Sequence, residues 1–154
     1  AYDEYAIKSF EVSAIDYLLK PIRASRLQAA IEKVEARISE KPQLSLQNSI
    51  FIKDSENYFI AKLKDVELFH TDGNYTKVCF NSESPLLHKS LNQIERQLDS
   101  AFFFRINRQQ IVNIQHIVHV EKWFKGKLKL QLTSGKEVEV SERQSVKLKQ
   151  QLSF

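Results

Sequence analysis

The chain has 154 residues, 42% of them hydrophobic and 27% charged, which is typical of a globular protein that folds in water. No apolar run approaches the roughly 20 residues that a membrane-spanning helix needs, and no signal sequence is recognised, so no membrane partner is predicted. The single Cys79 excludes an internal disulfide framework and predicts a cytoplasmic location. Residues 45–154 hold 16 basic and 12 acidic side chains, which account for the whole net charge of +4 and slightly favour a nucleic-acid partner.

The first 40 residues predict a helix, a strand and a second helix. Apolar residues at helical spacing predict a helix over 3–12, and the apolar run 14–19 predicts a short buried strand. The second helix is predicted to begin at Ser25, because Ser25 and Gln28 have the spacing of a capping box. The polar stretch 39–49 then predicts a linker.

Beyond the linker, short alternating segments predict antiparallel hairpins. The three predicted hairpins pair residues 49–53 with 57–61, 66–70 with 75–80, and 126–132 with 136–141. Two helices are predicted over 90–98 and 141–152, and each begins with a serine and a glutamine at capping-box spacing. The predicted fold class is therefore mainly β: an antiparallel sheet with one short internal helix and a C-terminal helix, preceded by an α-β-α segment.

Motifs for catalysis and metal binding are weak. Gly73, Gly126 and Gly135 lie far apart in predicted turns, so they cannot form a phosphate-binding loop. His116 and His119 are three residues apart, which places them on opposite faces of a strand and does not suit a single metal ion. We therefore predict no enzyme, no metal and no cofactor, and keep an unrecognised hydrolase as a remote alternative.

Three polar clusters favour DNA binding. "DGNYTK" (72–77) puts an amide, a phenol and a lysine at a hairpin tip, and "RINRQQ" (105–110) puts arginines and glutamines where a strand pattern breaks. Arg143 lies in the first turn of a predicted helix, where free N–H groups favour an anion. Arginine and glutamine can read guanine and adenine edges, whereas lysine and tyrosine suit phosphates. Arg105 continues the strand alternation and is predicted to be structural, whereas Arg108 interrupts it and is predicted to face DNA.

The stretches "AYDEYAIKSFEVSAIDYLLKPI" and "RLQAAIEKV" resemble the C-terminal third of a response-regulator receiver domain. The resemblance implies that Lys20 is the lysine that contacts the phosphoryl group, that the Lys20–Pro21 bond is cis, and that Tyr17 is the switch aromatic. The phosphoacceptor aspartate of such a domain falls outside this sequence, so Lys20 and Tyr17 are expected to be non-functional here. A sensor histidine kinase is the implied partner of a longer parent protein.

The stretches "KDVELFHTDGNYTKVCF", "LNQIERQL", "FFRINRQQIVNI" and "VSERQSVKLKQQL" resemble a LytTR DNA-binding domain of bacterial transcription regulators in order and spacing. The resemblance implies an elongated antiparallel β-fold that binds double-stranded DNA, with paired half-sites expected. The DNA-binding residues that it implies are Asn74, Tyr75, Thr76, Lys77, Arg108, Gln109 and Arg143.

The predicted domain organisation is a truncated receiver segment over 1–40, a linker over 41–49 and a LytTR domain over 50–154. The predicted function is sequence-specific DNA binding for transcription regulation, as the output domain of a two-component response regulator. The alternative is a protein-interaction or homodimerisation module through residues 1–40, whose apolar faces lack their usual packing partners in this sequence.

Overall fold

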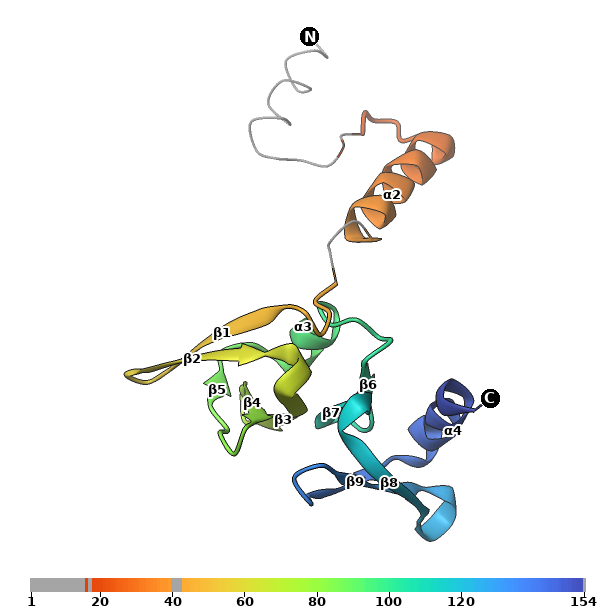
Figure 1. The fold of residues 1–154 in the computed structure, drawn as a ribbon. Helices are drawn as coiled ribbons and strands as arrows, with labels where there is room; N and C mark the ends of the chain where they lie inside the picture. Colours follow the sequence, from red (N-terminus) through yellow and green to blue (C-terminus); the bar gives the residue numbers. More distant parts are fainter. Residues whose placement is uncertain (1–15, 17, 40–42, 154) are drawn as a thin grey trace. The chain divides into compact units, whose positions relative to one another are not determined.

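The chain folds into two compact units, residues 1–42 and 43–154. The computed structural model describes residues 16, 18–39 and 43–153, which are coloured along the sequence in Figure 1. The predicted linker is partly built into the second unit. The backbone N–H of Leu44 donates to the carbonyl of Gln97 over 2.6 Å, and the carbonyl of Leu44 accepts from Asp99 over 3.0 Å.

The first unit contains helix α2 (Ala24–Ser39), preceded by a Lys20–Pro21 bond that is cis, as predicted. The helix starts one residue before Ser25, so Ser25 lies inside its first turn and the predicted start is wrong. The capping box is not formed either, and the side-chain amide of Gln28 donates instead to the carboxylate of Glu32 over 3.2 Å.

The helix predicted over 3–12 and the switch aromatic Tyr17 lie outside the described residues. Half of the strand predicted over 14–19 also lies outside them. Its described members Asp16, Leu18 and Leu19 belong to no strand. Lys20 is described and exposed.

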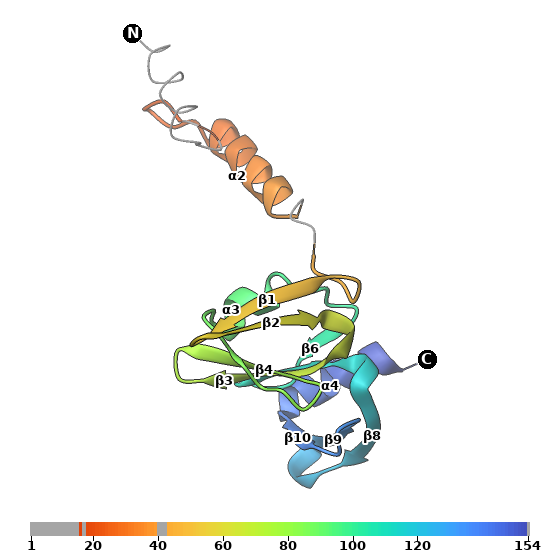
Figure 2. The same cartoon turned by 60° about the vertical axis from the view of Figure 1, so that its left-hand side comes forward.

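The second unit is built from three antiparallel sheets, seen from two directions in Figures 1 and 2. The first sheet pairs β1 (Ser49–Asp54) with β2 (Asn57–Lys62). The central sheet has the order β5-β4-β3-β7-β6, with β3 (Val66–Asp72), β4 (Tyr75–Phe80), β5 (Leu86–Leu87), β6 (Phe103–Arg105) and β7 (Gln110–Asn113). The third has the order β10-β9-β8, with β8 (Ile117–Lys122), β9 (Leu128–Leu132) and β10 (Glu137–Val140).

Two α-helices and three single turns of 3-10 helix complete the described part of this unit. The α-helices are α3 (Leu91–Glu95), before β6, and α4 (Glu142–Leu152), after β10. The 3-10 turns are Leu63–Asp65, Ile114–His116 and Phe124–Gly126. The prediction of a mainly β, antiparallel fold with one short internal and one C-terminal helix is confirmed.

The central sheet is buried on both faces. Phe69 and Ile111 point to one face and pack in a cluster with residues of β1, β2 and α3. Their neighbours Leu68 and Val112 point to the other face, because side chains alternate along a strand, and pack with the third sheet and with Leu148 of α4. Fully burying side chains of this size stabilises the fold by about 1.5–3 kcal/mol each. The central strands are therefore a rigid support for the loops at their ends.

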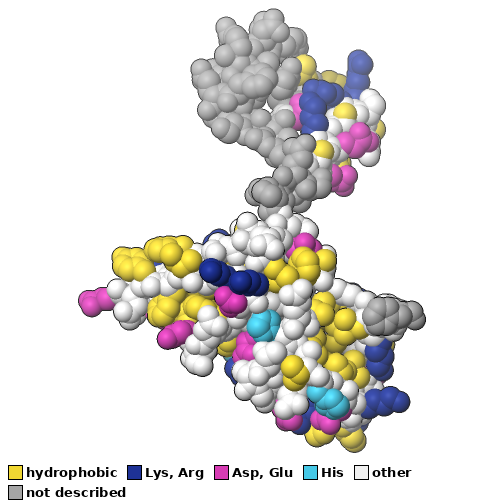
Figure 3. All heavy atoms as spheres, in the orientation of Figure 1, with side chains coloured by type: hydrophobic (Ala, Val, Ile, Leu, Met, Phe, Trp, Pro, Cys, Tyr) yellow, Lys and Arg dark blue, Asp and Glu magenta, His cyan; other side chains and the backbone are white. Residues whose placement is uncertain are grey.

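The outer face of the β1–β2 hairpin is apolar. Phe51, Tyr58 and Ile60 are 63%, 61% and 71% exposed, and the rings of Phe51 and Tyr58 stack with centroids 5.6 Å apart. Figure 3 shows hydrophobic side chains along this hairpin, on the left of the second unit. The pairing of β1 with β2 thus leaves one face covering the core and the other in solvent.

All three hairpins expected from the sequence are present: β1–β2, β3–β4 and β9–β10. The capping box of α3 is confirmed, because the hydroxyl of Ser90 accepts from the N–H of Gln93 and the Gln93 side chain accepts from the N–H of Ser90. The capping box predicted for Ser141 and Gln144 is not formed. Ser141 has the extended backbone of an N-cap, but its side chain makes no capping hydrogen bond.

Candidate nucleic-acid interface

Backbone hydrogen bonds bring the three polar clusters to one end of the second unit. The N–H of Thr71, near the end of β3, donates to the carbonyl of Gln109 over 2.8 Å. On the other side, the N–H of Ser141 donates to the carbonyl of Ile106 over 2.9 Å. The segment 106–109, called the Arg108 loop from here on, therefore lies between the β3–β4 hairpin and the start of α4.

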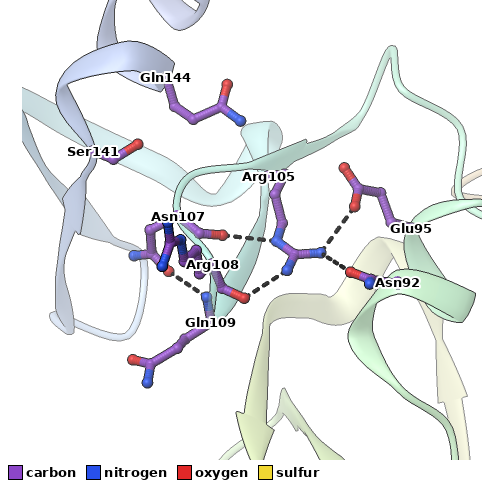
Figure 4. Close-up of a pocket in the computed structure, with 8 residues that line it drawn as sticks. All are labelled: Asn92, Glu95, Arg105, Asn107, Arg108, Gln109, Ser141 and Gln144. Atoms are coloured by element: carbon purple, nitrogen blue, oxygen red, sulfur yellow. Dashed lines mark hydrogen bonds and ion pairs between the residues drawn. The ribbon is translucent and has the colours of Figure 1, made fainter.

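Arg105 holds the Arg108 loop in place (Figure 4). Its Nε donates to the carbonyl of Asn107 over 2.7 Å, and its Nη2 donates to the carbonyl of Arg108 over 2.5 Å. Its Nη1 reaches Glu95 at 2.8 Å and Asn92 at 3.2 Å, both on α3. The Arg105 side chain is only 16% exposed. The prediction that Arg105 is structural is confirmed.

Asn107 fixes the same loop from the other side. Its side-chain nitrogen donates to the side chain of Gln110 and to the carbonyl of Glu139, both over 2.9 Å. Its side-chain oxygen accepts from the N–H of Gln109 over 2.8 Å. Arg108 and Gln109 are exposed, so the loop combines a tied backbone with two side chains that face solvent. A fixed backbone of this kind lowers the entropy lost when the loop binds a partner.

A cavity of about 760 Å³ lies beside the loop. Arg108 and Gln109 line it from the loop, and Ser141 and Gln144 line it from the start of α4 (Figure 4). Sequence reasoning placed Gln144 only in a capping box. Its position three residues after the N-cap, on the turn next to Arg143, is the signal that could have placed it here.

The β3–β4 hairpin presents three of its four predicted contact residues. Asn74 and Tyr75 are exposed, and the Tyr75 ring lies edge-on to His88 with centroids 4.5 Å apart. The ammonium of Lys77 pairs with Asp72 over 3.1 Å, and both side chains are substantially exposed.

Thr76 differs from these neighbours. It is fully buried, and its hydroxyl donates to the carbonyl of Lys89 over 2.9 Å. The strand alternation explains this position, because Thr76 points away from the face that carries Tyr75 and Lys77. Thr76 therefore has a structural place in this unit, and its predicted DNA contact does not fit its burial.

Arg143 is the second residue of α4 and is exposed. Within the described part of the chain, its guanidinium has no ion pair or side-chain hydrogen bond. Glu142, the first residue of the helix, is also exposed. A carboxylate in the first turn stabilises the helix through its dipole but repels a nearby phosphate. Arg143 and Glu142 therefore have opposite effects on the binding of an anion here.

Residues 16, 18–39 and 43–153 contain no group of three or more His, Cys, Asp and Glu side chains that could hold a metal ion. His116 is engaged structurally, with its ring nitrogens 2.8 Å from the hydroxyl of Thr133 and 2.8 Å from the carbonyl of Lys64. No helix over these described residues is both long enough and apolar enough to cross a membrane.

Comparison with known proteins identifies the family of the second unit. The family model described as LytTr DNA-binding domain matches residues 56–153. The sensory transduction protein LytT of Bacillus subtilis is 32% identical over 157 residues, covering 99% of this chain and 65% of that protein. The transcriptional regulatory protein LytR of Staphylococcus aureus (strain MW2) is 28% identical over 150 residues, covering 91% of this chain and 61% of that protein. The chain thus spans less than two thirds of the length of either relative.

The fold agrees with this assignment. A solved LytTr DNA-binding domain from Bacillus cereus matches with a TM-score of 0.64 over 69% of this chain and 97% of its own length, at 22% sequence identity. Because the family match covers more than half of the sequence, the chain belongs to the LytTR family of DNA-binding domains.

Proposed function

We propose that residues 43–154 bind double-stranded DNA in a sequence-specific manner, as the output domain of a two-component response regulator that controls transcription. The observation that carries the proposal is the presentation of Arg108. Its loop backbone is tied by Arg105 and Asn107, whereas its guanidinium is exposed between two further polar segments. An arginine held in this way can form the paired hydrogen bonds that distinguish guanine from other bases.

The other exposed residues of this end of the unit divide into two roles. Gln109 suits a base edge, since its amide can both donate and accept a hydrogen bond. Asn74, Tyr75, Lys77 and Arg143 are proposed to position the unit on the sugar-phosphate backbone. Phosphate contacts supply affinity for any sequence, and base contacts supply the preference for one of them.

The test begins with selection of bound sequences from a pool of random duplexes. Affinities for a selected duplex and for a mixed-sequence duplex are then measured for the unchanged chain, for Arg108→Ala and for Arg108→Lys. Arg108→Ala is expected to weaken binding to the selected duplex by about 1–3 kcal/mol. Arg108→Lys keeps the charge but loses the planar fork, so it should retain binding to mixed sequence and lose discrimination.

A matched control is Lys64→Ala, because Lys64 lies in the 3-10 turn before β3, at the opposite end of that strand from Asp72. It removes one exposed positive charge without touching the proposed interface. Equal discrimination by the unchanged chain and by Arg108→Ala, with the fold intact, would show that Arg108 does not read a base.

We further propose that the chain binds paired half-sites as a homodimer on DNA, because a single small domain reads few base pairs. Selected sequences should then contain a repeated half-site, and two chains should bind each duplex. A full-length parent protein is proposed to act in the cytoplasm under a sensor histidine kinase. Phosphotransfer from a purified kinase to that parent is the direct test.

A second candidate function is protein interaction through the first unit. It is favoured by Leu27 and Ile31, which are 42% and 43% exposed on successive turns of α2. Replacing both with serine should lower the solution mass if this surface holds two copies together. An unchanged mass equal to one chain, for the original and the variant, would exclude it.

A further inference from the structure

Residues 122–127, called the β8–β9 turn from here on, comprise the last residue of β8 and the connection to β9, and carry the sequence "KWFKGK". Lys122 and Lys125 are exposed, Trp123 is 44% exposed and Phe124 is 72% exposed. The two rings are flanked by cations, and the ammonium of Lys129 lies 4.6 Å from the centroid of the Trp123 ring. None of these residues belongs to the interface described above.

The fold places this turn next to that interface. Leu128, the first residue of β9, pairs with Val140, and the next residue, Ser141, is the N-cap of α4. A Cβ atom at Gly126 would lie 3.9 Å from the side chain of Glu142. Figure 1 shows the turn and α4 at the same end of the third sheet. The polar segments therefore form a row: the β3–β4 hairpin, the Arg108 loop, the start of α4 and the β8–β9 turn.

The charges of the turn differ from those of the neighbouring strand. The hydrogen bond from Lys129 to Glu137, at 2.5 Å, raises the pKa of Lys129, and Glu121 lies 3.7 Å from the same ammonium. The positive charge of Lys129 is thus compensated by carboxylates of its own sheet. Among the described residues, no carboxylate lies within ion-pair distance of Lys122 or Lys125, so both charges are available to an external anion.

The backbone of the turn holds Lys125 at its tip. Lys125 has φ +54° and ψ +44°, a left-handed conformation that disfavours residues with a side chain. Gly126 follows with φ +74°, and the N–H of Trp123 donates to the carbonyl of Lys127 over 2.9 Å. The ammonium of Lys125 lies 5.3 Å from the centroid of the Phe124 ring. Lys125 therefore stands at a turn position where asparagine or glycine is the unstrained choice.

We propose that the β8–β9 turn is a further DNA contact, in which Lys122 and Lys125 bind phosphates beyond the Arg143 side of the interface. The partner follows from charge complementarity and from the continuity of the row of segments. The contact carries no base preference, because a flexible ammonium recognises a phosphate as a point charge. This inference rests on the proposed function of the second unit. Glu142, on the neighbouring helix, opposes the contact, and Glu121 and Glu137 together carry one negative charge more than the Lys129 that they share.

The test compares the salt dependence of binding for two double variants. Lys122→Gln/Lys125→Asn removes both charges, and asparagine retains the left-handed turn. Lys62→Gln/Lys64→Gln removes two charges at the end of β2 and in the turn before β3, away from the row. Each variant is titrated against a selected duplex and a mixed-sequence 30-base-pair duplex between 50 and 300 mM salt, and urea unfolding checks the fold.

The slope of log K against log salt should fall by about 1.8 for the turn variant, at about 0.9 per phosphate contact, and affinity should drop by about 10- to 60-fold at 0.1 M salt. The loss should be equal on both duplexes, and the control variant should keep its slope. Unchanged binding by a folded turn variant overturns the inference and leaves the proposed function standing. A loss on the selected duplex alone overturns it as well, because it would indicate base reading. Failure of the unchanged chain to bind either duplex overturns both proposals.

Discussion

The clearest prediction concerns Arg105, which is expected to control DNA binding without touching DNA. Arg105→Ala removes two charge-assisted hydrogen bonds to the backbone of the Arg108 loop, to the carbonyls of Asn107 and Arg108. It also removes the link to Glu95 on α3. With these bonds gone, the loop has fewer constraints on the direction in which the Arg108 side chain points.

The expected loss of stability in Arg105→Ala depends on how exposed each hydrogen-bond partner of Arg105 is. A hydrogen bond to a charged group contributes about 1.5–3 kcal/mol, and the lower value suits loop carbonyls that water can reach after the substitution. The pair with Glu95, whose side chain is 48% exposed, adds at most about 1 kcal/mol. The free energy of unfolding should therefore fall by about 3–4 kcal/mol. If the loop then holds its binding conformation for only a few per cent to a fifth of the time, DNA affinity falls by about 5- to 30-fold.

Urea unfolding and fluorescence anisotropy with a labelled duplex measure the two effects. The distinguishing quantity is the salt slope. A residue that binds phosphate lowers it by about 0.9 when it is removed, whereas a residue that only orients the loop leaves it unchanged. Arg105→Lys should give an intermediate loss, since lysine cannot reproduce the fork that joins both carbonyls. A slope lowered by about 1, or an affinity that does not change at all, would refute the role assigned to Arg105.

Three further predictions address the surrounding structure. Thr76→Val should lower the free energy of unfolding by about 1–3 kcal/mol, because the carbonyl of Lys89 loses its donor, and should leave the salt slope unchanged. Asn113→Leu should cost more, about 2–5 kcal/mol in urea unfolding, since the fully buried Asn113 bonds the carbonyl of Val66 over 3.0 Å and the N–H of Gln115 over 3.1 Å. Glu142→Gln should tighten binding to any duplex by about 2- to 5-fold at low salt, an effect that 0.5 M salt should remove. An equal or weaker affinity would show that Glu142 lies away from the phosphates.

Local patterns in the sequence predicted the hairpins because the signals for a hairpin are local. Alternation gives the faces of both strands, and a turn residue such as Gly73, with φ +57°, gives the reversal. The capping box of Ser90 and Gln93 is local in the same sense. The same motif failed at Ser25, where the helix begins one residue earlier and Gln28 bonds within the helix instead.

The order of the strands was not predictable in this way. β3 lies between β4 and β7, so His70 is opposite both Lys77 and Gln110, residues that are far apart in the sequence. This pairing is what brings the hairpin tip beside the Arg108 loop. Periodicity contains no information on which strands become neighbours, because that depends on how two apolar faces are covered at once.

The two arginines at 105 and 108 show why some functional detail can nonetheless be inferred from sequence. Arg105 ends β6 and is opposite Ile111, so its long side chain starts from the sheet and runs along the loop backbone. Arg108 stands where the strand pairing has stopped, so its carbonyl is taken by Arg105 while its own guanidinium is left exposed. The break in the apolar alternation after Ile106 predicts this difference between a structural Arg105 and an exposed Arg108. What it could not show is the dependence of one arginine on the other, which follows only from the hydrogen bonds that join them.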